Sequence, residues 1–438
     1  MGLDLAYCRG QGYDGASNMS GKCIGAAKLI QNDNEKAVFV PCASHRLNLC
    51  VAKSCDIPSI RKLVGFIAKT CAFFSFPKRL LLLQTFIKEK YPSEKRSKLV
   101  NVCATRWIER IDALEVFEDL FEPIMLSLDH IANNIDGTWS GTGNYMVDAE
   151  GIYTALGSFQ SIMALVTSRR MLAYTRPTTT ILQTRQMDFI QGHNSICPLK
   201  ESLSEIRKNV NTYSNQFFEK AVELASVINI EPSIPRTCGI QRHRDNLPAE
   251  NPQEFYRRSL LIPFLDHMIN QIETRFSNNH TSLMKGLAII PKIVMERLNT
   301  GALVPWKDDF KQFLSIYEDD LPFLNNLETE MDLWETNCRR QSETTLAKDL
   351  TTTLKEITNM KDTFPTILTA LQILGTVPVT TCECERSNSA LKRLKDYKRS
   401  TIGQEGHSMS RVTNKYLNLK FTPLSETLPD IYGRDIYG

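Results

Sequence analysis

The order of apolar and polar positions divides the chain into a short N-terminal part of mixed character and a long helical remainder. Apolar extended runs at residues 3–8 and 37–41 predict two strands, and helical spacing over 21–30 predicts a helix between them. A strand, a helix and a strand in this order predict a parallel pair joined by a right-handed crossover. From His45 onward, the apolar spacing predicts a buried helix.

The region after Cys55 shows apolar residues at helical spacing almost throughout. This spacing predicts a helix that begins near Asp112 and an apolar helical stripe from Leu156 to Val166. Residues 133–144 are rich in Gly, Asn and Thr, which predicts a loop. The middle of the chain is therefore expected to be all-helical.

A further helix is predicted to begin at Asn251, because Asn caps helix N-termini and a proline follows it at the first turn. This helix should run towards Phe276, with a kink at Pro263. The final segment, 364–419, has the pattern of at least two helices separated by a turn near Ser400.

Composition narrows the classes of protein to consider. The chain has 52 Lys and Arg against 49 Asp and Glu, which excludes a strongly basic coat protein and an acidic solvating protein. Its 12 Cys in 438 residues are too sparse for a secreted disulfide scaffold and indicate reduced thiols. No apolar stretch approaches the roughly 20 residues that cross a bilayer, and no signal peptide is evident. We expect an intracellular protein that makes no use of a membrane.

The first candidate site is the Gly-rich stretch that contains Asp14, directly after the first predicted strand. Ligands of open α/β sheets collect at the carboxyl ends of strands, so Asp14 is placed to hold a metal ion. The alternative is a turn aspartate that bonds its own backbone.

The second candidate is Cys42-Ala43-Ser44-His45, after the second predicted strand, with Cys50 and Cys55 nearby. A zinc site needs about four ligands in tetrahedral geometry, and a single Cys-x-x-His supplies two. Packed thiols with a hydrogen-bonded histidine are the alternative.

The third candidate begins at Cys382 and contains Glu385, a carboxylate that could bind a metal. A basic run that could contact nucleic-acid phosphates follows it: Lys392, Arg393, Lys395, Lys398 and Arg399. The alternative is a charged helix with acids first and bases last, which suits the helix dipole.

A second basic cluster comprises Arg242, Arg244, Arg257 and Arg258. These side chains could likewise contact phosphates, or they could pair with acids such as Asp245 and Glu254. The chain has no phosphate-binding loop of the Gly-x-x-x-x-Gly-Lys type and no nucleophile elbow, so no small-molecule substrate is evident.

In order along the chain, several motifs resemble the hAT superfamily of DNA transposases. They are CRGQGYDGASNMSG from Cys8, CASHRLNL from Cys42, TRWIER with Trp107, and residues 368–405. They resemble in particular the domesticated MYM-type zinc-finger and protein-kinase-inhibitor-repressor-like subgroup of that superfamily.

This resemblance implies a mainly α fold with a small α/β part, namely a truncated RNase H-like core split by a large all-helical insertion. Residues 1–56 would form part of the core and 57–363 the insertion. Residues 364–422 would form a hAT-like dimerisation region that completes the core, and 423–438 a tail.

The resemblance also implies chemistry. Asp14 would be the second catalytic carboxylate and Glu385 the last, holding Mg²⁺ or Mn²⁺ for attack on DNA phosphate. The family's first aspartate should lie on a strand well before Asp14, and only thirteen residues precede Asp14 here. We therefore expect both acids to be vestigial and the chain to be non-catalytic. The alternative is a metal-dependent DNA transposase or nuclease whose first aspartate comes from a missing N-terminal segment.

The expected function is that of a transposon-derived nuclear protein that associates with itself and binds nucleic acid without sequence preference. No cofactor is expected unless the enzymatic alternative holds.

Overall fold

The computed structural model describes residues 4–21, 24–101, 107–140, 144–184, 192, 195–235, 249–276, 281–301 and 304–378. It is mainly helical, as predicted. The described residues form two compact units. The terminal unit contains those up to His45, those of 183–192 and those from Thr281 on, and the middle unit those of 46–182 and 195–276. No helix within these ranges is long and apolar enough to cross a membrane.

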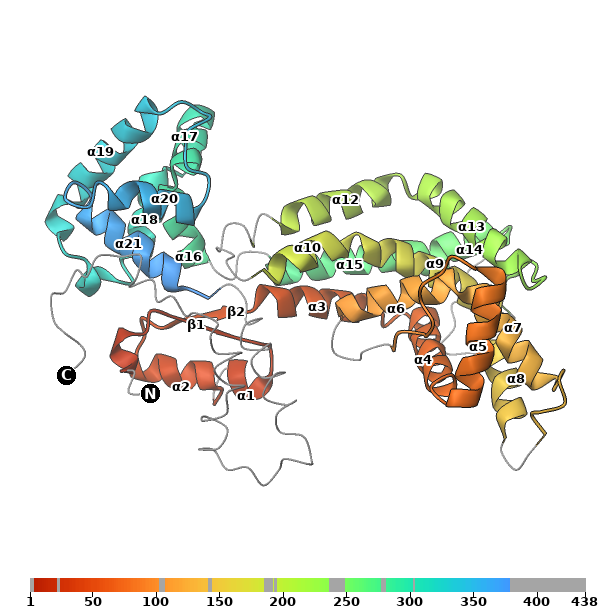
Figure 1. The fold of residues 1–438 in the computed structure, drawn as a ribbon. Helices are drawn as coiled ribbons and strands as arrows, with labels where there is room; N and C mark the ends of the chain where they lie inside the picture. Colours follow the sequence, from red (N-terminus) through yellow and green to blue (C-terminus); the bar gives the residue numbers. More distant parts are fainter. Residues whose placement is uncertain are drawn as a thin grey trace, which may run out of the picture. The chain divides into compact units, whose positions relative to one another are not determined.

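The terminal unit contains a parallel pair of strands, which confirms the predicted arrangement. Strand β1 (Gly10–Tyr13) pairs with β2 (Val38–Pro41), with Tyr13 opposite Pro41. The short helix α1 (Ser17–Ser20) and helix α2 (Ala26–Asp33) connect the strands, and α2 lies alongside them (Figure 1).

The strand predicted at residues 3–8 is wrong. Leu5–Tyr7 form a 3₁₀ turn, η1, in which the Asp4 carboxylate accepts a hydrogen bond of 2.9 Å from the Ala6 amide. The strand instead occupies Gly10–Tyr13, within the Gly-rich stretch that leads to Asp14. Its stability comes from distant contacts: the buried Gln11 amide donates to the carbonyls of Ala27 and Ala37, at 3.0 and 2.9 Å.

Gly12 is required in β1 by a close approach of the chain. A Cβ atom there would lie 2.7 Å from Cγ of Pro378, closer than packed atoms allow. The segment at Val377 and Pro378 therefore packs against the glycine face of this strand. No local pattern in the sequence signals this contact.

Helices complete the terminal unit and share one hydrophobic core with β2, whose Val40 is 2% exposed. The largest side chains in that core are Trp306, Trp334 and Tyr317. The helices are α16 (Thr281–Gly286), η3 (Leu287–Ile289), α17 (Pro291–Thr300), α18 (Trp306–Leu314), η4 (Glu318–Asp320), η5 (Leu324–Asn326), α19 (Leu327–Arg340), α20 (Leu350–Thr358) and α21 (Pro365–Thr376).

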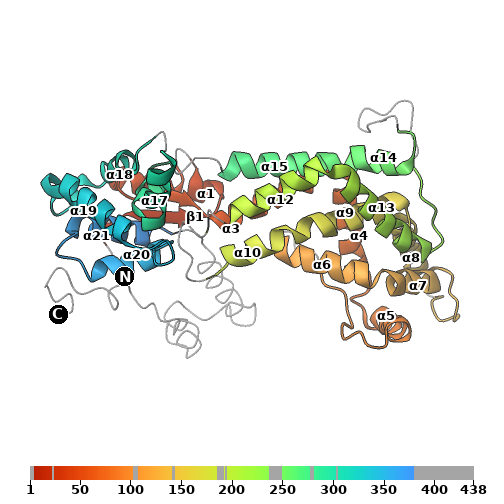
Figure 2. The ribbon, with the colours of Figure 1, turned by 90° about the horizontal axis from the view of Figure 1, so that it is seen from above.

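The middle unit is all-helical in the described residues. Figure 2 shows α10, α12 and α15 running alongside one another. Its helices are α3 (Ala43–Ser54, from Arg46 on), α4 (Pro58–Phe73), α5 (Pro77–Lys90), α6 (Trp107–Asp119), α7 (Phe121–Ala132), α8 (Tyr145–Leu156), α9 (Phe159–Ala173), α10 (Thr175–Leu182), α12 (Ile196–Lys208), α13 (Val210–Ser226), α14 (Pro252–Tyr256), the π turn η2 (Arg257–Leu261) and α15 (Ile262–Phe276).

The predicted helix start at Asn251 is confirmed in detail. The Asn251 side chain accepts a hydrogen bond of 2.8 Å from the Glu254 amide, and Pro252 occupies the first turn. The irregularity predicted at Pro263 is a π turn that ends two residues before it. Proline has no amide hydrogen to donate, which favours such a break in the α-helical bonding.

Two helix boundaries differ from the pattern. Helix α6 begins at Trp107, five residues before the predicted start near Asp112. The apolar stripe from Leu156 to Val166 is divided between α8 and α9, because Ser158 caps α9 by accepting from the Ser161 amide. Apolar spacing alone does not reveal this break, because the helices on both sides of it bury apolar residues.

Candidate functional site

The strand pair brings the first two candidate motifs to one edge. Asp14 follows β1 and Cys42 follows β2, and the parallel register places Tyr13 opposite Pro41. The Cys42 amide donates to the Tyr13 carbonyl at 3.0 Å, which extends the ladder by one step. The carboxyl ends of both strands therefore present Asp14 and the Cys-x-x-His motif at the same side of the sheet.

Asp14 closes a turn. Its Oδ1 accepts a hydrogen bond of 3.1 Å from the Ala16 amide, and the side chain is half-buried. This is the backbone-bonding role that the sequence left open as the alternative to metal binding.

In the Cys-x-x-His motif, Cys42 directly precedes α3 and His45 lies in the first turn of that helix. Cys42 is 1% exposed, and its Sγ accepts a hydrogen bond of 3.4 Å from the backbone amide of His45. In the middle unit, the Cys50 thiol donates to the Gln271 carbonyl at 3.3 Å, and burial raises its pKa to about 12. These contacts match the packed-thiol alternative.

The described residues at the strand edge do not fit a two-metal site. They supply a single carboxylate, Asp14, whereas the implied Mg²⁺ or Mn²⁺ pair needs several. Across the described ranges, no group of three His, Cys, Asp or Glu side chains is arranged to hold a metal ion. Glu385 lies outside those ranges. No catalytic step is derived from this edge.

Several other predicted site residues also fall outside the description. They are the side chain of Trp107, which begins α6, and the basic run Lys392, Arg393, Lys395, Lys398 and Arg399. Arg242 and Arg244 of the second basic cluster lie outside it as well.

The described members of the second basic cluster have protein partners. Arg257 donates to the Asn211 side chain at 2.6 Å and lies 3.8 Å from Glu254. Arg258 lies 3.4 Å from the same carboxylate. Glu254, one of the two acids that the sequence offered as partners, is therefore used by both arginines, and Asp245 lies outside the described residues.

An ion-pair network on α6 was not singled out from the sequence. Glu118 is 4% exposed, and its Oε1 accepts from Arg169 of α9 at 2.7 Å. Burial raises the pKa of Glu118, and Arg169 opposes that rise. Arg176 of α10 bonds Asp112 and Glu115 at 2.8 and 2.6 Å. The helical spacing of these acids was the signal in the sequence that could have revealed the network.

The apolar residues predicted to mediate self-association lie partly in the terminal unit's own core. Leu368, Leu371, Ile373 and Leu374 of α21 are between 0 and 7% exposed. Up to Pro378, the apolar residues of this segment therefore pack inside the terminal unit. The second half of the predicted surface, including Val412 and Tyr416, lies outside the described residues.

Comparison with known proteins places the C-terminal region in a family. Residues 332–414 match the model described as the hAT family C-terminal dimerisation region. A human protein named "52 kDa repressor of the inhibitor of the protein kinase" is 27% identical over 427 residues, which are 96% of this chain and 54% of that protein. The mouse protein of that name is 28% identical over 428 residues, with the same coverage.

The chain spans about half the length of the curated relatives it matches. The matched region contains α20, α21 and most of α19. These findings confirm the resemblance that the motifs indicated: residues 332–414 match the hAT family C-terminal dimerisation region, and 96% of the chain is similar to proteins named as repressors of the inhibitor of the protein kinase.

Proposed function

We propose that this chain is a transposon-derived protein that associates with itself through its hAT-type region and does not cut or join DNA. The observation that carries the proposal is the match of residues 332–414 to a dimerisation region. Nuclear localisation is part of the proposal, supported by the repressor names of the relatives.

The exposure of apolar side chains on the described helices limits which residues can form the self-association surface. Helix α21 uses its apolar residues inside the terminal unit, so they are not offered to a second copy. Within the matched region, Leu333 on α19 is 48% exposed. We propose that the contact is made by residues 379–414, with Leu333 as a candidate on the described surface.

Light scattering of the full chain at micromolar concentration tests self-association. The unmodified chain should be a dimer or larger, and Val412→Asp should reduce its mass while circular dichroism shows unchanged helix content. Val304→Asp is the matched control, because Val304 is 47% exposed and lies outside the matched region. A monomeric unmodified chain would overturn the proposal.

We further propose that the two ends of the chain build one core, as in an RNase H-like domain split by an insertion. Val40 of β2 shares a hydrophobic core with Leu371 of α21, which supports this reading. On this proposal, residues 1–56 and 364–422 contribute to the split core and the insertion lies within 57–363. The helices from Thr281 to Thr358 share the core of the terminal unit, so the insertion itself corresponds to the middle unit. Asp14 and Glu385 would then be vestigial, and Asp14 serves its own turn.

Incubation of the full chain with labelled duplex DNA and Mg²⁺ or Mn²⁺ tests the absence of catalysis. The DNA should remain intact. Cleavage that Asp14→Ala abolishes would establish the enzymatic alternative instead.

Weak DNA binding without sequence preference is the remaining part of the proposal. The candidate contacts are the basic residues 392–399, since Arg257 and Arg258 already have protein partners. Affinity should fall steeply with salt, because each phosphate contact releases counterions. An isotherm unchanged between low and physiological salt would contradict phosphate contact.

A further inference from the structure

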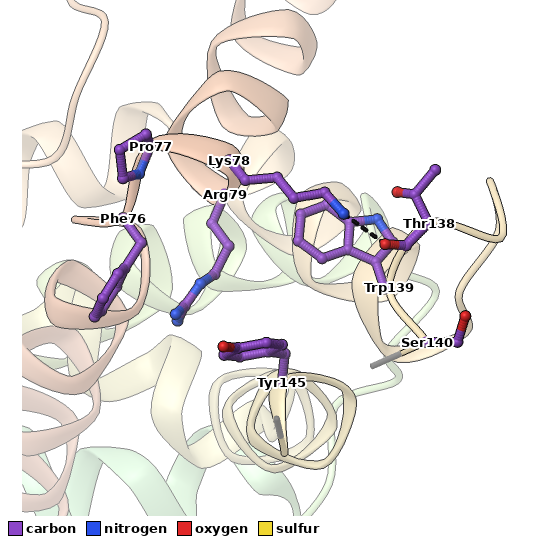
Figure 3. Close-up of a pocket in the computed structure, with 8 residues that line it drawn as sticks. All are labelled: Phe76, Pro77, Lys78, Arg79, Thr138, Trp139, Ser140 and Tyr145. Atoms are coloured by element: carbon purple, nitrogen blue, oxygen red, sulfur yellow. Dashed lines mark hydrogen bonds between the residues drawn. The ribbon is translucent and has the colours of Figure 1, made fainter. Parts of the chain in front are cut away.

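A pocket of about 290 Å³ lies in the middle unit, at the N-terminal end of α5 (Figure 3). Its walls come from the start of α5, from the loop after α7 and from Tyr145 at the start of α8. The volume is at the low end of the roughly 300–1,000 Å³ typical of ligand pockets and suits one or two side chains. None of its residues has a role in the proposed function.

Arg79 is the main charged group of this pocket, and aromatic rings hold it in place. Its guanidinium carbon lies 4.2 Å from the centre of the Phe76 ring and 4.8 Å from that of Tyr145. The ring of Phe73 is 4.4 Å away. No salt bridge joins Arg79 to a carboxylate of the described residues, although the charge of Asp148 acts on it and opposes the fall in its pKa that burial causes. The rings therefore fix a guanidinium whose hydrogen-bond donors have no acidic partner there.

The opposite wall adds further donors. Lys78 lies over the Trp139 ring at 4.1 Å and donates to the Thr138 carbonyl at 2.5 Å. Trp139 is 5% exposed, and its indole N–H has no hydrogen-bond partner among the described residues. A buried donor without a partner costs about 1–3 kcal/mol, so a ligand that brings an acceptor is favoured. The lining has two cations, an unsatisfied N–H and no acidic side chain.

The surroundings favour a peptide over a nucleic acid. Large apolar side chains with exposed fractions between 42 and 67% lie within three residues of the lining: Phe76, Leu81, Ile135, Tyr145 and Val147. Exposed apolar groups of this kind mark protein contacts, whereas nucleic-acid interfaces are polar and strongly positive.

The chain itself contains a segment of matching chemistry. Its tail has the tetrapeptide Asp-Ile-Tyr-Gly twice, at 430–433 and 435–438. Each copy joins a carboxylate to an aliphatic and an aromatic side chain. We propose that the pocket binds an Asp-Ile-Tyr-Gly segment of this tail, with the aspartate accepting from Arg79 and the apolar side chains covering Phe76 and Tyr145.

Fluorescence anisotropy with a labelled peptide of residues 428–438 tests this proposal. The full chain carrying Asp430→Asn and Asp435→Asn is the receptor, so that its own tail does not compete. Binding should be saturable, and Arg79→Gln in that receptor should weaken it at least tenfold, as expected for loss of a charge-assisted contact. Arg61→Gln is the matched control, an exposed arginine on α4 outside the pocket, and should leave binding unchanged.

Three results would overturn the proposal. They are the absence of saturable binding, equal binding of a scrambled peptide, and binding that Arg79→Gln leaves intact while circular dichroism shows a folded receptor. The outcome is independent of the proposed self-association, because light scattering of the Arg79→Gln chain reports the hAT-region contact separately.

Discussion

Arg9 and Asp320, which are 311 residues apart in the sequence, form a two-bond ion pair in the terminal unit. Arginine Nε lies 2.7 Å from Oδ2, and Nη2 lies 2.8 Å from Oδ1. Each side chain is 17% exposed, and Lys36 approaches the same carboxylate at 3.2 Å. The pair therefore ties the segment before β1 to the 3₁₀ turn after α18.

Asp320→Asn should destabilise the terminal unit. Arg9 and Lys36 are largely buried, and the substitution removes the negative charge that they share. We expect a loss of about 1–3 kcal/mol in the free energy of unfolding, below the range for fully buried pairs since solvent screens this one in part. Urea denaturation measures it. Asp319→Asn is the control, because that side chain is 88% exposed, and it should cost under about 0.5 kcal/mol. Equal losses in the two variants would contradict the stabilising role of the pair.

The same pair predicts a pH dependence. Burial raises the pKa of Asp320, but hydrogen bonds from Arg9 and Lys36 outweigh it and leave the pKa below its usual value. A carboxyl with a lowered folded pKa stabilises the fold above its unfolded pKa, about 3.9, and loses that contribution as the pH falls through the folded value. The stability difference between the unmodified chain and Asp320→Asn should be constant near neutrality and shrink below about pH 4. Thermal melts from pH 7 to pH 2 would show it, and a difference that grows on acidification would refute it.

Arg169→Met should lower the free energy of unfolding by more than the partial exposure of the Arg169 side chain suggests. It leaves Glu118, whose side chain is 2% exposed, as a buried carboxylate without its cation, at a cost of about 3 kcal/mol. Adding Glu118→Gln should recover part of the loss, because the buried charge is then removed. Arg207→Met provides the comparison: its pair with Asp266 is exposed and should be worth under about 1 kcal/mol. A double variant no more stable than the single one would argue against charge burial as the cause.

The thiols should differ widely in reactivity. Burial raises the pKa of Cys50 and of Cys338 to about 12, so both are protonated at pH 8, whereas Cys197 is exposed. The thiolate attacks iodoacetamide and displaces iodide, so Cys197 should be modified well before the other two in the native chain. Peptide mass spectrometry at increasing times measures the order. Modification of Cys50 at the rate of Cys197 would show that its site opens in the native state.

Part of the candidate site could be expected from the sequence. The pattern predicts two parallel strands, each followed by one of the candidate motifs, and parallel strands end at the same edge of a sheet, where Asp14 and Cys42 lie. Whether Asp14 and Glu385 bind a metal stays a prediction. The aromatic setting of Arg79 could not be foreseen, because Tyr145 lies 66 positions further along the chain and no local pattern connects them.

The sequence by itself determined the helical character, the parallel strand pair, the start of α14 at Asn251 and the hAT relationship. These depend on short-range effects: a cap acts three residues away, and apolar spacing fixes which face is buried. Only the tertiary structure decided that β1 is Gly10–Tyr13. This strand is held by a hydrogen bond of the Gln11 side chain and by the packing of Pro378 against Gly12, and neither contact can be seen in the apolar pattern of the sequence. The tertiary structure also decided the pairing of Arg9 with Asp320. The energy of an ion pair depends on the distance between the two charges in space, so the sequence shows no pattern from which this pair could be predicted.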